Sequence, residues 1–431
     1  MNQPLKVAIA GLGTVGAGTV KLLRDNAAAI SLRAGRDIRI VAISARDRAK
    51  DRGFKPAGEA WFDDPVQMAK TIEADVIVEL IGGADGPAKA AVEAAIARKK
   101  HVVTANKALL AHHGAALATA AEAAGVSLMF EAAVAGGIPI IKTLREGLAA
   151  NVISRVYGIL NGTCNYILTE MRNTKRDFAD VLTEAQSLGY AEKPDPGLDI
   201  DGVDAAHKLA VLASVAFGTA VDFGAVHVEG IRQIGALDME YAEQLGYRIK
   251  LVGLAARQGR AIEQRVYPCM MAPTAPLATV DGVFNAVVAE GDAVGRVALS
   301  GRGAGAGPTA SAVVADLIDV ASGRRTPAFG VPAARLERAA TLPISKRVGA
   351  YYVRLVVVDR PGVFADIATA FRDESVSMET VVQRGRNSGA NVNVVIITHD
   401  TEEAALTKAL AKLQTNAAVV EPPHMIRIES F

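Results

Sequence analysis

The sequence predicts an α/β protein with three parts: an N-terminal doubly wound parallel sheet, an α+β middle domain, and a C-terminal ferredoxin-like βαββαβ domain. Short apolar runs alternate with helical stretches up to residue 131, and a strand–helix periodicity restarts after residue 349. The length of 431 residues suits about three domains. We place the parts at 1–131, 132–308 and 349–431. Between the last two we expect a return helix (309–322), packed on the first domain, and a linker reaching residue 348.

In the N-terminal part, apolar runs of strand length are separated by helical patterns, which implies βαβ units and a parallel sheet. The expected strands are Leu5–Ala10, Ile38–Ser44, Ala74–Ile81, His101–Thr104 and Val126–Glu131. The expected helices are Val20–Ile30, Pro87–Lys100 and Ala108–Ala124.

The middle part has a mixed pattern that does not reveal the order of its strands. Helices are expected at Asp177–Leu188 and Asp204–Ala216, joined by an acidic loop rich in proline and glycine. Strands are expected to start at Arg232–Gln233 and Ile249–Leu254. A second Gly-rich stretch, Ser300–Gly307, precedes the return helix.

The C-terminal part predicts the split βαββαβ order in about 80 residues. Its expected elements are strand Tyr351–Val358, helix Phe364–Asp373, strands Ser377–Gln383 and Ala390–Thr398 around the turn Arg386–Gly389, helix Glu402–Gln414 and strand Met425–Glu429.

Composition narrows the class of protein. The chain has 47 basic and 46 acidic residues and a net charge of +1. This balance disfavours nucleic-acid or membrane partners and suits an enzyme of small metabolites. The two cysteines are far apart, and the N-terminus lacks a signal-peptide pattern, so we expect a cytoplasmic protein.

The residues Gly11-Leu12-Gly13-Thr14-Val15-Gly16 match the GxGxxG pattern. The match is informative because it follows a strand and opens a helix, as in Rossmann-type dinucleotide-binding domains. Gly11 permits the tight turn, Gly13 lets the backbone approach the pyrophosphate, and Gly16 lets helix and strand pack closely. The alternative is a Gly-rich turn without a ligand.

The end of the second strand bears on the choice of nicotinamide cofactor. NAD-binding folds usually have an acid there, whereas this strand ends Ile43-Ser44-Ala45-Arg46. Arg46 suits a 2′-phosphate, so we favour NADP, with NAD possible. The alternative is a solvated basic loop.

A nicotinamide-dependent reduction of an aldehyde needs a group that protonates the new alkoxide. A catalytic zinc is disfavoured, because the cysteines are isolated and His112 and His113 are adjacent on a helix. Lys208 follows Asp204 at the i+4 spacing, directly after the carboxylate-rich loop 189–204. Lys107 follows the strand that ends at Thr104, on the side of the sheet where ligands bind. Solvated surface lysines are the alternative at both positions.

Eight segments, in this order, resemble homoserine dehydrogenase over nearly the whole chain. They are Gly11–Gly16, Val78–Gly83, Thr104–Lys107, Glu131–Pro139, Asn161–Tyr166, Leu188–Glu192, Asp204–Leu209 and Pro308–Val313. The resemblance implies interconversion of L-aspartate 4-semialdehyde and L-homoserine with NAD(P)H, in threonine and methionine biosynthesis. The alternatives are another amino-acid-linked NAD(P) dehydrogenase and a catalytically inactive amino-acid or nucleotide sensor.

The same resemblance implies roles for individual residues. Lys208 is the expected proton donor, Asp204 orients it, and Lys107 assists at substrate and cofactor. Glu192 and Asp199 are expected to hold the substrate amino group. The other implied cofactor neighbours are Thr14, Val15, Thr104, Gly189 and Gly303. The implied ligands of a monovalent cation, such as sodium, are the Glu131 carboxylate and the carbonyls of Val134, Gly136 and Ile138; a hinge without metal is the alternative.

The chain departs from the family pattern in one loop. Family members usually read Ala-Glu-x-Asp-Pro, whereas Ala191-Glu192-Lys193-Pro194-Asp195-Pro196 is one residue longer. The extra residue is expected to shift Glu192 relative to Asp199. The spacing of Asp199, Asp204 and Lys208 is kept.

The C-terminal part resembles an ACT domain, because Asp359-Arg360-Pro361-Gly362-Val363 matches its strand-to-helix ligand turn. The resemblance implies an amino-acid effector, expected to be threonine, contacted by Asp359, Pro361, Gly362 and Val363 between two copies of the domain. We therefore expect a homodimer or homotetramer. A domain used for dimerisation alone is the alternative.

Overall fold

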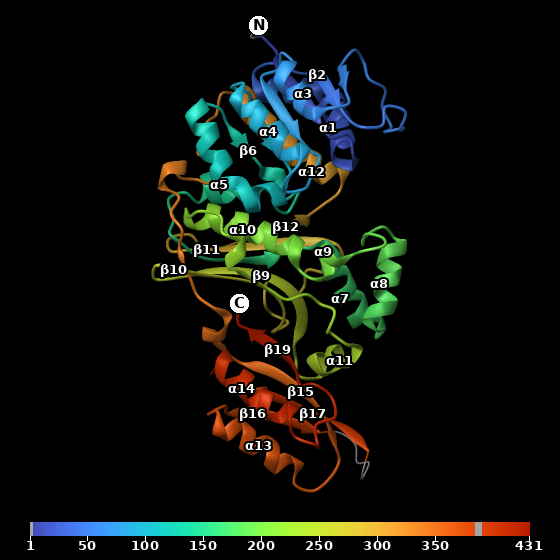
Figure 1. Cartoon of the computed structure of the whole chain (residues 1–431), viewed down its shortest axis with the longest axis vertical. Helices are drawn as coiled ribbons and strands as arrows, with labels where there is room; N and C mark the ends of the chain where they lie inside the picture. The colour runs from blue at the N-terminus through green and yellow to red at the C-terminus, as the bar shows by residue number, and fades with distance from the viewer. Residues whose placement is uncertain (1–2, 384–389) are drawn as a thin grey trace.

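The computed structural model describes residues 3–383 and 390–431, which form an elongated molecule of three lobes (Figure 1). The N-terminal lobe lies at the top of the view, the middle lobe below it, and the C-terminal lobe at the bottom. The expected turn Arg386–Gly389 lies outside the described residues. Among those residues, no helix is both long and apolar enough to cross a bilayer.

The N-terminal lobe contains the expected parallel sheet, with strand order β3-β2-β1-β4-β5-β6. The order reverses between β1 and β4, which is where such sheets bind ligands. The strands are β1 (Leu5–Ala10), β2 (Ile38–Ser44), β3 (Ala60–Phe62), β4 (Val76–Glu79), β5 (His101–Thr104) and β6 (Leu128–Met129). Strand β3 and helix α3 (Pro65–Thr71) were not predicted.

Helices cover both faces of this sheet. The single helix predicted at Val20–Ile30 is wrong: α1 (Thr14–Asp25) ends before Asn26, whose non-helical backbone separates it from α2 (Ala27–Ala34). The helices predicted around Pro87 and Ala108 are α4 (Pro87–Ala97) and α5 (Lys107–Ala124). Helix α12 (Ala306–Ala321) returns from the middle lobe and packs on α1, where Gly18 approaches the Ala306 carbonyl closely.

The middle lobe is built on a sheet with the order β12-β11-β7-β9-β10, in which neighbouring strands are antiparallel. Its strands are β7 (Ile153–Ile159), β9 (Arg248–Gln258), β10 (Ala261–Met271), β11 (Phe284–Gly291) and β12 (Gly295–Arg302). Its main helices are α7 (Gly162–Thr174), α8 (Phe178–Ser187) and α10 (Val203–Phe217). The strand start predicted at Arg232–Gln233 is wrong, because these residues form a turn between β8 (Val226–Val228) and α11 (Ala236–Gln244).

The C-terminal lobe has the predicted βαββαβ order, and its sheet runs β19-β15-β17-β16. The elements are β15 (Tyr351–Val358), α13 (Val363–Asp373), β16 (Met378–Gln383), β17 (Asn391–Thr398), α14 (Glu403–Gln414) and β19 (His424–Glu429). Strand β19 also pairs in parallel with β10, so both lobes share one 11-stranded sheet. Nothing in the sequence pattern predicted this junction.

The remaining elements are short segments within or between the lobes. They are α6 (Ile140–Lys142), α9 (Gly197–Ile200), the strands β13 (Ala340–Thr341), β14 (Val348–Gly349) and β18 (Thr401–Glu402), the 3₁₀ turns Glu131–Ala133, Phe223–Ala225, Ala333–Arg335 and Ile344–Lys346, and a π turn at Thr143–Gly147.

Candidate active site

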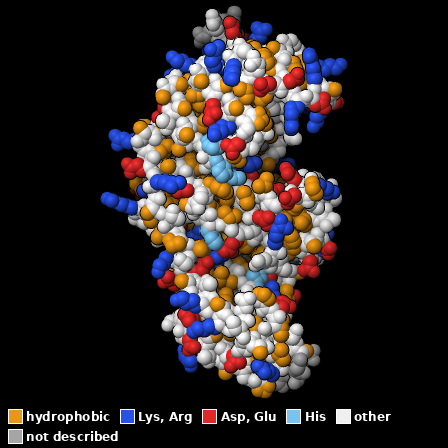
Figure 2. All heavy atoms as spheres, viewed as in Figure 1, with side chains coloured by type: hydrophobic (Ala, Val, Ile, Leu, Met, Phe, Trp, Pro, Cys, Tyr) orange, Lys and Arg blue, Asp and Glu red, His pale blue; other side chains and the backbone are white. Residues whose placement is uncertain are grey.

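Two adjoining cavities lie where the N-terminal sheet ends. One, of about 800 Å³, lies along β1 and β2, and the other, of about 330 Å³, lies between the N-terminal and middle lobes. Leu80 and Ile81 line both cavities, so the two are contiguous. The outline of the molecule is indented between these lobes (Figure 2). An extended ligand therefore has a path along the sheet edge into the interlobe cavity.

The glycines of the first turn take the geometry that the motif requires. Gly11 has φ +95°, and a Cβ there would lie 2.5 Å from the Leu80 carbonyl oxygen. A Cβ on Gly16 would lie 2.0 Å from the Gly11 carbonyl oxygen, so helix and turn pack without space for a side chain. Gly13 precedes the first residue of α1 and borders open space in the larger cavity. The free N–H groups of α1 are thus accessible to a pyrophosphate.

The far end of the larger cavity is lined by basic residues, including Arg46 and Lys50. Its acidic residues already accept hydrogen bonds: Asp64 from Val66 N–H at 2.8 Å, and Asp47 from Ala49 N–H at 2.9 Å. Within the described chain, Arg46 has no ion-pair partner. Positive charge is therefore available at the place where a cofactor ribose would sit.

In the interlobe cavity, Asp204 brings together the two lysines that the sequence singled out. Lys208 Nζ lies 2.7 Å from Asp204 Oδ2, and Lys107 Nζ lies 3.3 Å from Asp204 Oδ1. Lys107 is the first residue of α5, whose N-cap Asn106 accepts a bond from Leu109 N–H at 3.0 Å. Two ammonium groups from separate lobes thus meet at Asp204; Lys107 and Asp204 line the cavity, whereas Lys208 is buried and is not part of its lining.

The environment of Asp204 keeps it ionised. Burial raises its pKa, but Lys208, Lys107 and a hydrogen bond from Asn161 outweigh burial and hold the pKa well below its ordinary value. Lys208 also donates to the Leu160 carbonyl at 2.7 Å, and its side chain is 11% exposed. Its ammonium group is thus fixed by two acceptors and retains a third N–H.

Asn161 connects the two carboxylates of the site. Its Nδ2 donates to Asp199 Oδ1 and to Asp204 Oδ2, each at 2.9 Å, while its Oδ1 caps α7 by accepting from Cys164 N–H. Thr163 Oγ1 also lies 3.3 Å from Asp199 Oδ2, although its nearer acceptor is the Tyr190 carbonyl at 2.7 Å. Burial is the main cause that raises the pKa of Asp199, and the negative charge of Asp204 raises it further. A cationic ligand group beside Asp199 would relieve this cost.

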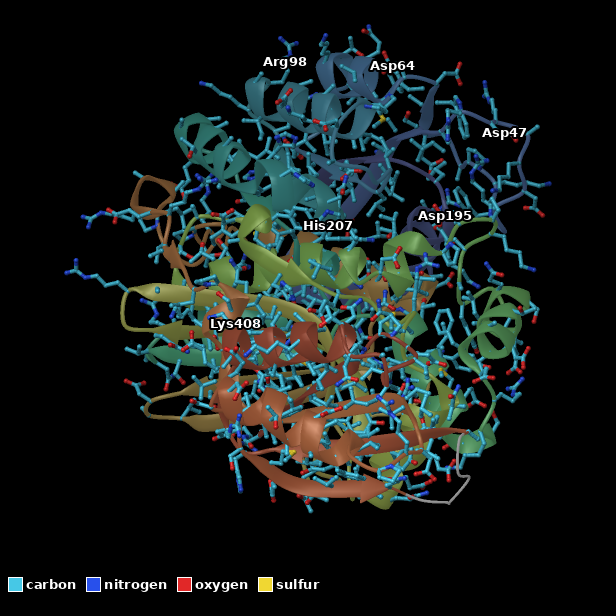
Figure 3. All side chains as sticks on the ribbon, turned by 60° about the horizontal axis from the view of Figure 1, so that its bottom comes forward. Asp47, Asp64, Arg98, Asp195, His207 and Lys408 are labelled. Atoms are coloured by element: carbon cyan, nitrogen blue, oxygen red, sulfur yellow. The ribbon has the colours of Figure 1, made fainter. Side chains whose placement is uncertain are left out.

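The longer loop still carries Glu192 to the cavity, where Glu192 and Asp195 both contribute to the lining. Asp195 and His207 are labelled in Figure 3 at the boundary of the two lobes, whereas Asp47 and Asp64 lie out on the N-terminal lobe. The one-residue insertion therefore leaves both carboxylates of the pattern, Glu192 and Asp195, at the cavity.

Several predicted cofactor residues do not line either cavity. Thr104 is buried and donates to Glu79 at 2.6 Å, and Glu79 in turn accepts from the N–H groups of Ile81 and Gly82. Thr14 and Gly189 are exposed outside both linings. Gly303 packs against Gly136, where a Cβ would meet its carbonyl oxygen at 2.4 Å. Val15 does line the interlobe cavity.

Sequence reasoning assigned no role to Asn161, Asp195 or His207. Burial, then His112, lowers the pKa of His207 to about 4, so its imidazole is neutral near pH 7. His207 lines the cavity and its ring lies 4.5 Å from that of Phe223. In the sequence, its position next to Lys208 could have indicated that it lies at the site. For Asn161, the indication was its place directly before helix α7, as the N-cap residue.

The residues expected around a cation lie in a buried hinge. Glu131 accepts bonds from the N–H groups of Ile141 and Lys142, at 2.9 and 2.8 Å. Burial, then Asp316, raises the pKa of Glu131 to about 7. Asp316 is fully buried; its Oδ1 has no hydrogen-bond partner and lies 3.5 Å from Lys142 Nζ, which also pairs with Asp319. The hinge therefore holds three carboxylates beside one ammonium group, and oxygen ligands of this kind suit a hard monovalent cation.

The fold and this site define a nicotinamide-dependent dehydrogenase. Comparisons with known protein families agree with this class. Residues 11–131 match the profile of the homoserine dehydrogenase NAD binding domain, residues 139–318 that of homoserine dehydrogenase, and residues 351–417 that of the ACT domain.

Full-length relatives give the same assignment. The chain is 46% identical to a homoserine dehydrogenase of Neisseria gonorrhoeae, covering 100% of this chain and 99% of that protein. It is 45% identical to one of Pseudomonas aeruginosa, covering 100% of both. A crystal structure of a homoserine dehydrogenase from Thiobacillus denitrificans superposes with a TM-score of 0.92 at 46% identity, covering 99% of each chain. The chain belongs to the homoserine dehydrogenase family, and it is an NAD(P)-dependent oxidoreductase with a C-terminal ACT domain.

Proposed function

We propose that the interlobe cavity interconverts L-aspartate 4-semialdehyde and L-homoserine with Lys208 as the proton-transfer group. The observation that carries this role is the pair of ammonium groups on Asp204, from two lobes, at 2.7 and 3.3 Å. A bound nicotinamide supplies the hydride or accepts it. Lys208 gives a proton to the aldehyde oxygen in reduction and takes it from the homoserine hydroxyl in oxidation. Asp204 fixes its direction, and Lys107 adds positive charge beside the developing oxyanion.

The acidic side of the cavity is suited to the substrate ammonium group. Asp199, Glu192 and Asp195 all line it. We assign Asp199 as the main partner, because Asn161 fixes its carboxylate and burial, the largest cause, raises its pKa. Glu192 and Asp195 hold the outer side of the site. The substrate carbonyl carbon is then placed towards Lys208 and the sheet edge.

We propose NADP as the preferred cofactor, with Arg46 as the principal contact of the 2′-phosphate. Support comes from the exposed Arg46 and Lys50 in the larger cavity and from Ser44, not an acid, at the end of β2. A structure described as a hyperthermophilic archaeal homoserine dehydrogenase in complex with NADPH is 26% identical, with a TM-score of 0.65, covering 76% of this chain and 100% of that one.

The cofactor proposal has a direct test. Arg46→Ala should weaken NADPH binding about 10- to 100-fold, as expected for loss of a charge-assisted hydrogen bond, and leave NADH binding nearly unchanged. Nucleotide fluorescence titration measures both. Lys21→Ala is the matched control, on the exposed side of α1. Equal losses for both nucleotides would contradict recognition of the 2′-phosphate by Arg46.

A monovalent cation such as sodium is proposed at the hinge, held by Glu131 and the carbonyls of Val134, Gly136 and Ile138. It would supply counter-charge to Glu131 and Asp316 and stiffen the connection between the lobes. The close packing of Gly136 against Gly303 supports a structural role at this crossing.

The ACT domain is proposed to respond to threonine at the turn before α13. Gly362 has φ +97° and precedes the first residue of that helix, which suits a backbone contact with a carboxylate. Asp359, Pro361 and Val363 flank it. A cytoplasmic homodimer or homotetramer is proposed, because such turns lie between copies of an ACT domain.

The activity itself is tested by following nicotinamide absorbance with purified protein. We expect homoserine-dependent reduction of NADP and aspartate-semialdehyde-dependent oxidation of NADPH, and no turnover of aspartate with either cofactor. Turnover of aspartate would favour the other amino-acid dehydrogenase. Binding without turnover of any of these compounds would favour the inactive sensor.

A further inference from the structure

A cavity of about 550 Å³ lies between the ACT domain and the middle lobe, away from the predicted effector turn. Helix α14 contributes Leu410 and Gln414 to its wall. The turn 229–234 of the middle lobe contributes Arg232 and Ile234. None of residues 359–363 lines it. Figure 3 views the molecule from the C-terminal side and marks α14 by the label of Lys408.

The cavity presents an ion pair that is accessible to a ligand. Arg232 donates two hydrogen bonds to Asp201, at 2.5 and 3.0 Å, and the two side chains are 50% and 45% exposed. The nearby Glu229 is already held through both oxygens by Arg427. The Asp201–Arg232 pair is therefore the polar feature that a ligand can open at modest cost.

This lining matches a small α-amino acid with an uncharged side chain. The planar guanidinium of Arg232 suits the ligand carboxylate, and Asp201 suits its ammonium group. Leu410 and Met425 provide an apolar wall for a short side chain. An anion bound to Arg232 would leave Asp201 without a cationic partner. A cation bound to Asp201 would leave Arg232 without an anionic partner. A zwitterion supplies a partner to both and therefore fits best.

The floor of this cavity is joined directly to the active site. Asp201 follows α9, which carries Asp199, at two residues' distance. Ile231 N–H donates to the Ile200 carbonyl at 2.9 Å. A Cβ on Gly230 would lie 2.2 Å from that same oxygen, so the turn and α9 are in tight contact. Arg232 and Asp201 are thus connected to Asp199 through direct main-chain contacts.

We infer that this cavity is an effector site for a small neutral α-amino acid, formed within a single chain, and that its occupation alters the position of Asp199. The ligand opens the Asp201–Arg232 pair and binds between the separated charges. The effect on catalysis rests on the proposed function, whereas binding at the cavity does not.

Isothermal titration of the full-length protein with L-threonine tests the inference, with L-valine as its apolar isostere. N-acetyl-L-threonine, which lacks the ammonium group, is the negative probe. We expect L-threonine and L-valine to bind and N-acetyl-L-threonine to bind at least about tenfold more weakly. Arg232→Ala and the cavity-filling Leu410→Trp should each weaken threonine binding by at least about tenfold. Lys408→Ala, also on α14, should not.

Asp359→Ala separates this cavity from the turn before α13. Threonine binding that persists in Arg232→Ala and Leu410→Trp but is lost in Asp359→Ala would overturn the inference, and so would absence of binding to the unmodified protein. Homoserine oxidation without added amino acid is measured in parallel. If Arg232→Ala turns over homoserine normally but ignores threonine, the proposed reaction and the cavity both stand, and the turn before α13 is not the threonine site. If the unmodified protein binds threonine at the cavity but turns over nothing, only the proposed function fails.

Discussion

Two ion clusters occupy the two boundaries between lobes, and they are built in opposite ways. At the upper boundary, one carboxylate, Asp204, contacts two ammonium groups, and Lys107 is 41% exposed. At the lower boundary, one guanidinium, Arg427, is 2% exposed and binds two carboxylates, Glu229 and Glu403, with paired bonds of 2.6 to 2.8 Å.

The difference separates a cluster suited to chemistry from one suited to attachment. The Asp204 cluster borders a cavity through Lys107 and Asp204, and each of its lysines retains N–H groups beyond its bond to Asp204, so protons can be exchanged with a ligand. The Arg427 cluster is saturated: burial raises the pKa of Glu229, but the bonds from His227 and Arg427 outweigh burial and lower it to about 2. A lysine that lines a cavity, such as Lys107, can contact a ligand. The buried guanidinium of Arg427 instead binds one acid from each lobe and so attaches the ACT domain to the middle lobe.

The largest expected effect comes from removing the Arg427 guanidinium, which tests whether the lower cluster attaches the ACT domain. Arg427→Leu leaves the buried Glu403 carboxylate, 7% exposed, without its partner and removes one of the partners of the 39% exposed Glu229, so it should cost about 3 kcal/mol of unfolding free energy. Urea denaturation followed by fluorescence measures the loss. Lys175→Ala, which removes an exposed pair with Glu243, is the control and should cost less than about 1 kcal/mol. A loss of similar size in both variants would show that the lower cluster does not attach the domains.

The sequence predicted best what depends on local pattern. The strands β5 and β15 were predicted at the residues where they occur, because short apolar runs bounded by turn residues determine them. The fold class was confirmed for the same reason. The junction of β10 with β19 was missed, because pairing between residues about 160 positions apart leaves no local periodicity. The turn at Arg232 was mistaken for a strand because its apolar neighbours Ile231 and Ile234 are buried individually.

The site was predicted where a motif fixed both residue type and spacing. Asp204 and Lys208 share a helix face, so their contact followed from the i+4 spacing. Asn161 belongs to the family-like segment Asn161–Tyr166, but the sequence predicts no role for it, because its two acceptors come from other elements. Thr104 was expected at the cofactor, but burial directs its hydroxyl to Glu79 instead. Side-chain direction, which the sequence does not encode locally, separates these cases.

Substitutions of Asn161 test whether its amide donor supports catalysis at the upper cluster. Asn161→Ala removes the donor shared by Asp199 and Asp204 and should lower kcat/KM about 10- to 100-fold, the equivalent of one to two such hydrogen bonds. Asn161→Asp retains the cap on α7 but adds a carboxylate beside two others, so it should lose activity with little loss of stability. Thermal unfolding separates the two effects. Full activity in Asn161→Asp would contradict the role of the amide donor.

His207 provides a smaller effect that depends on pH. Its pKa is about 4 in the folded chain against an ordinary value of 6.5. Between pH 6.5 and 4 the unfolded chain therefore binds a proton that the folded chain does not, and stability falls as the pH falls. His207→Gln should reduce the stability lost between pH 7 and pH 5 by about 1 kcal/mol, discounted for partial exposure. His399→Gln, at an exposed histidine, should leave that difference unchanged, and equal behaviour of both variants would refute the assignment.

The transfer of a proton by Lys208 is tested most directly by a single turnover of NADPH with aspartate semialdehyde in Lys208→Met. We predict a rate about 10²- to 10⁴-fold below that of the unmodified protein, with NADPH affinity unchanged within about threefold, because the proposed contacts of the pyrophosphate and the 2′-phosphate, Gly11–Gly16 and Arg46, lie on the N-terminal lobe. A rate within about tenfold of the unmodified protein would contradict the assignment of Lys208 as the group that protonates the substrate oxygen.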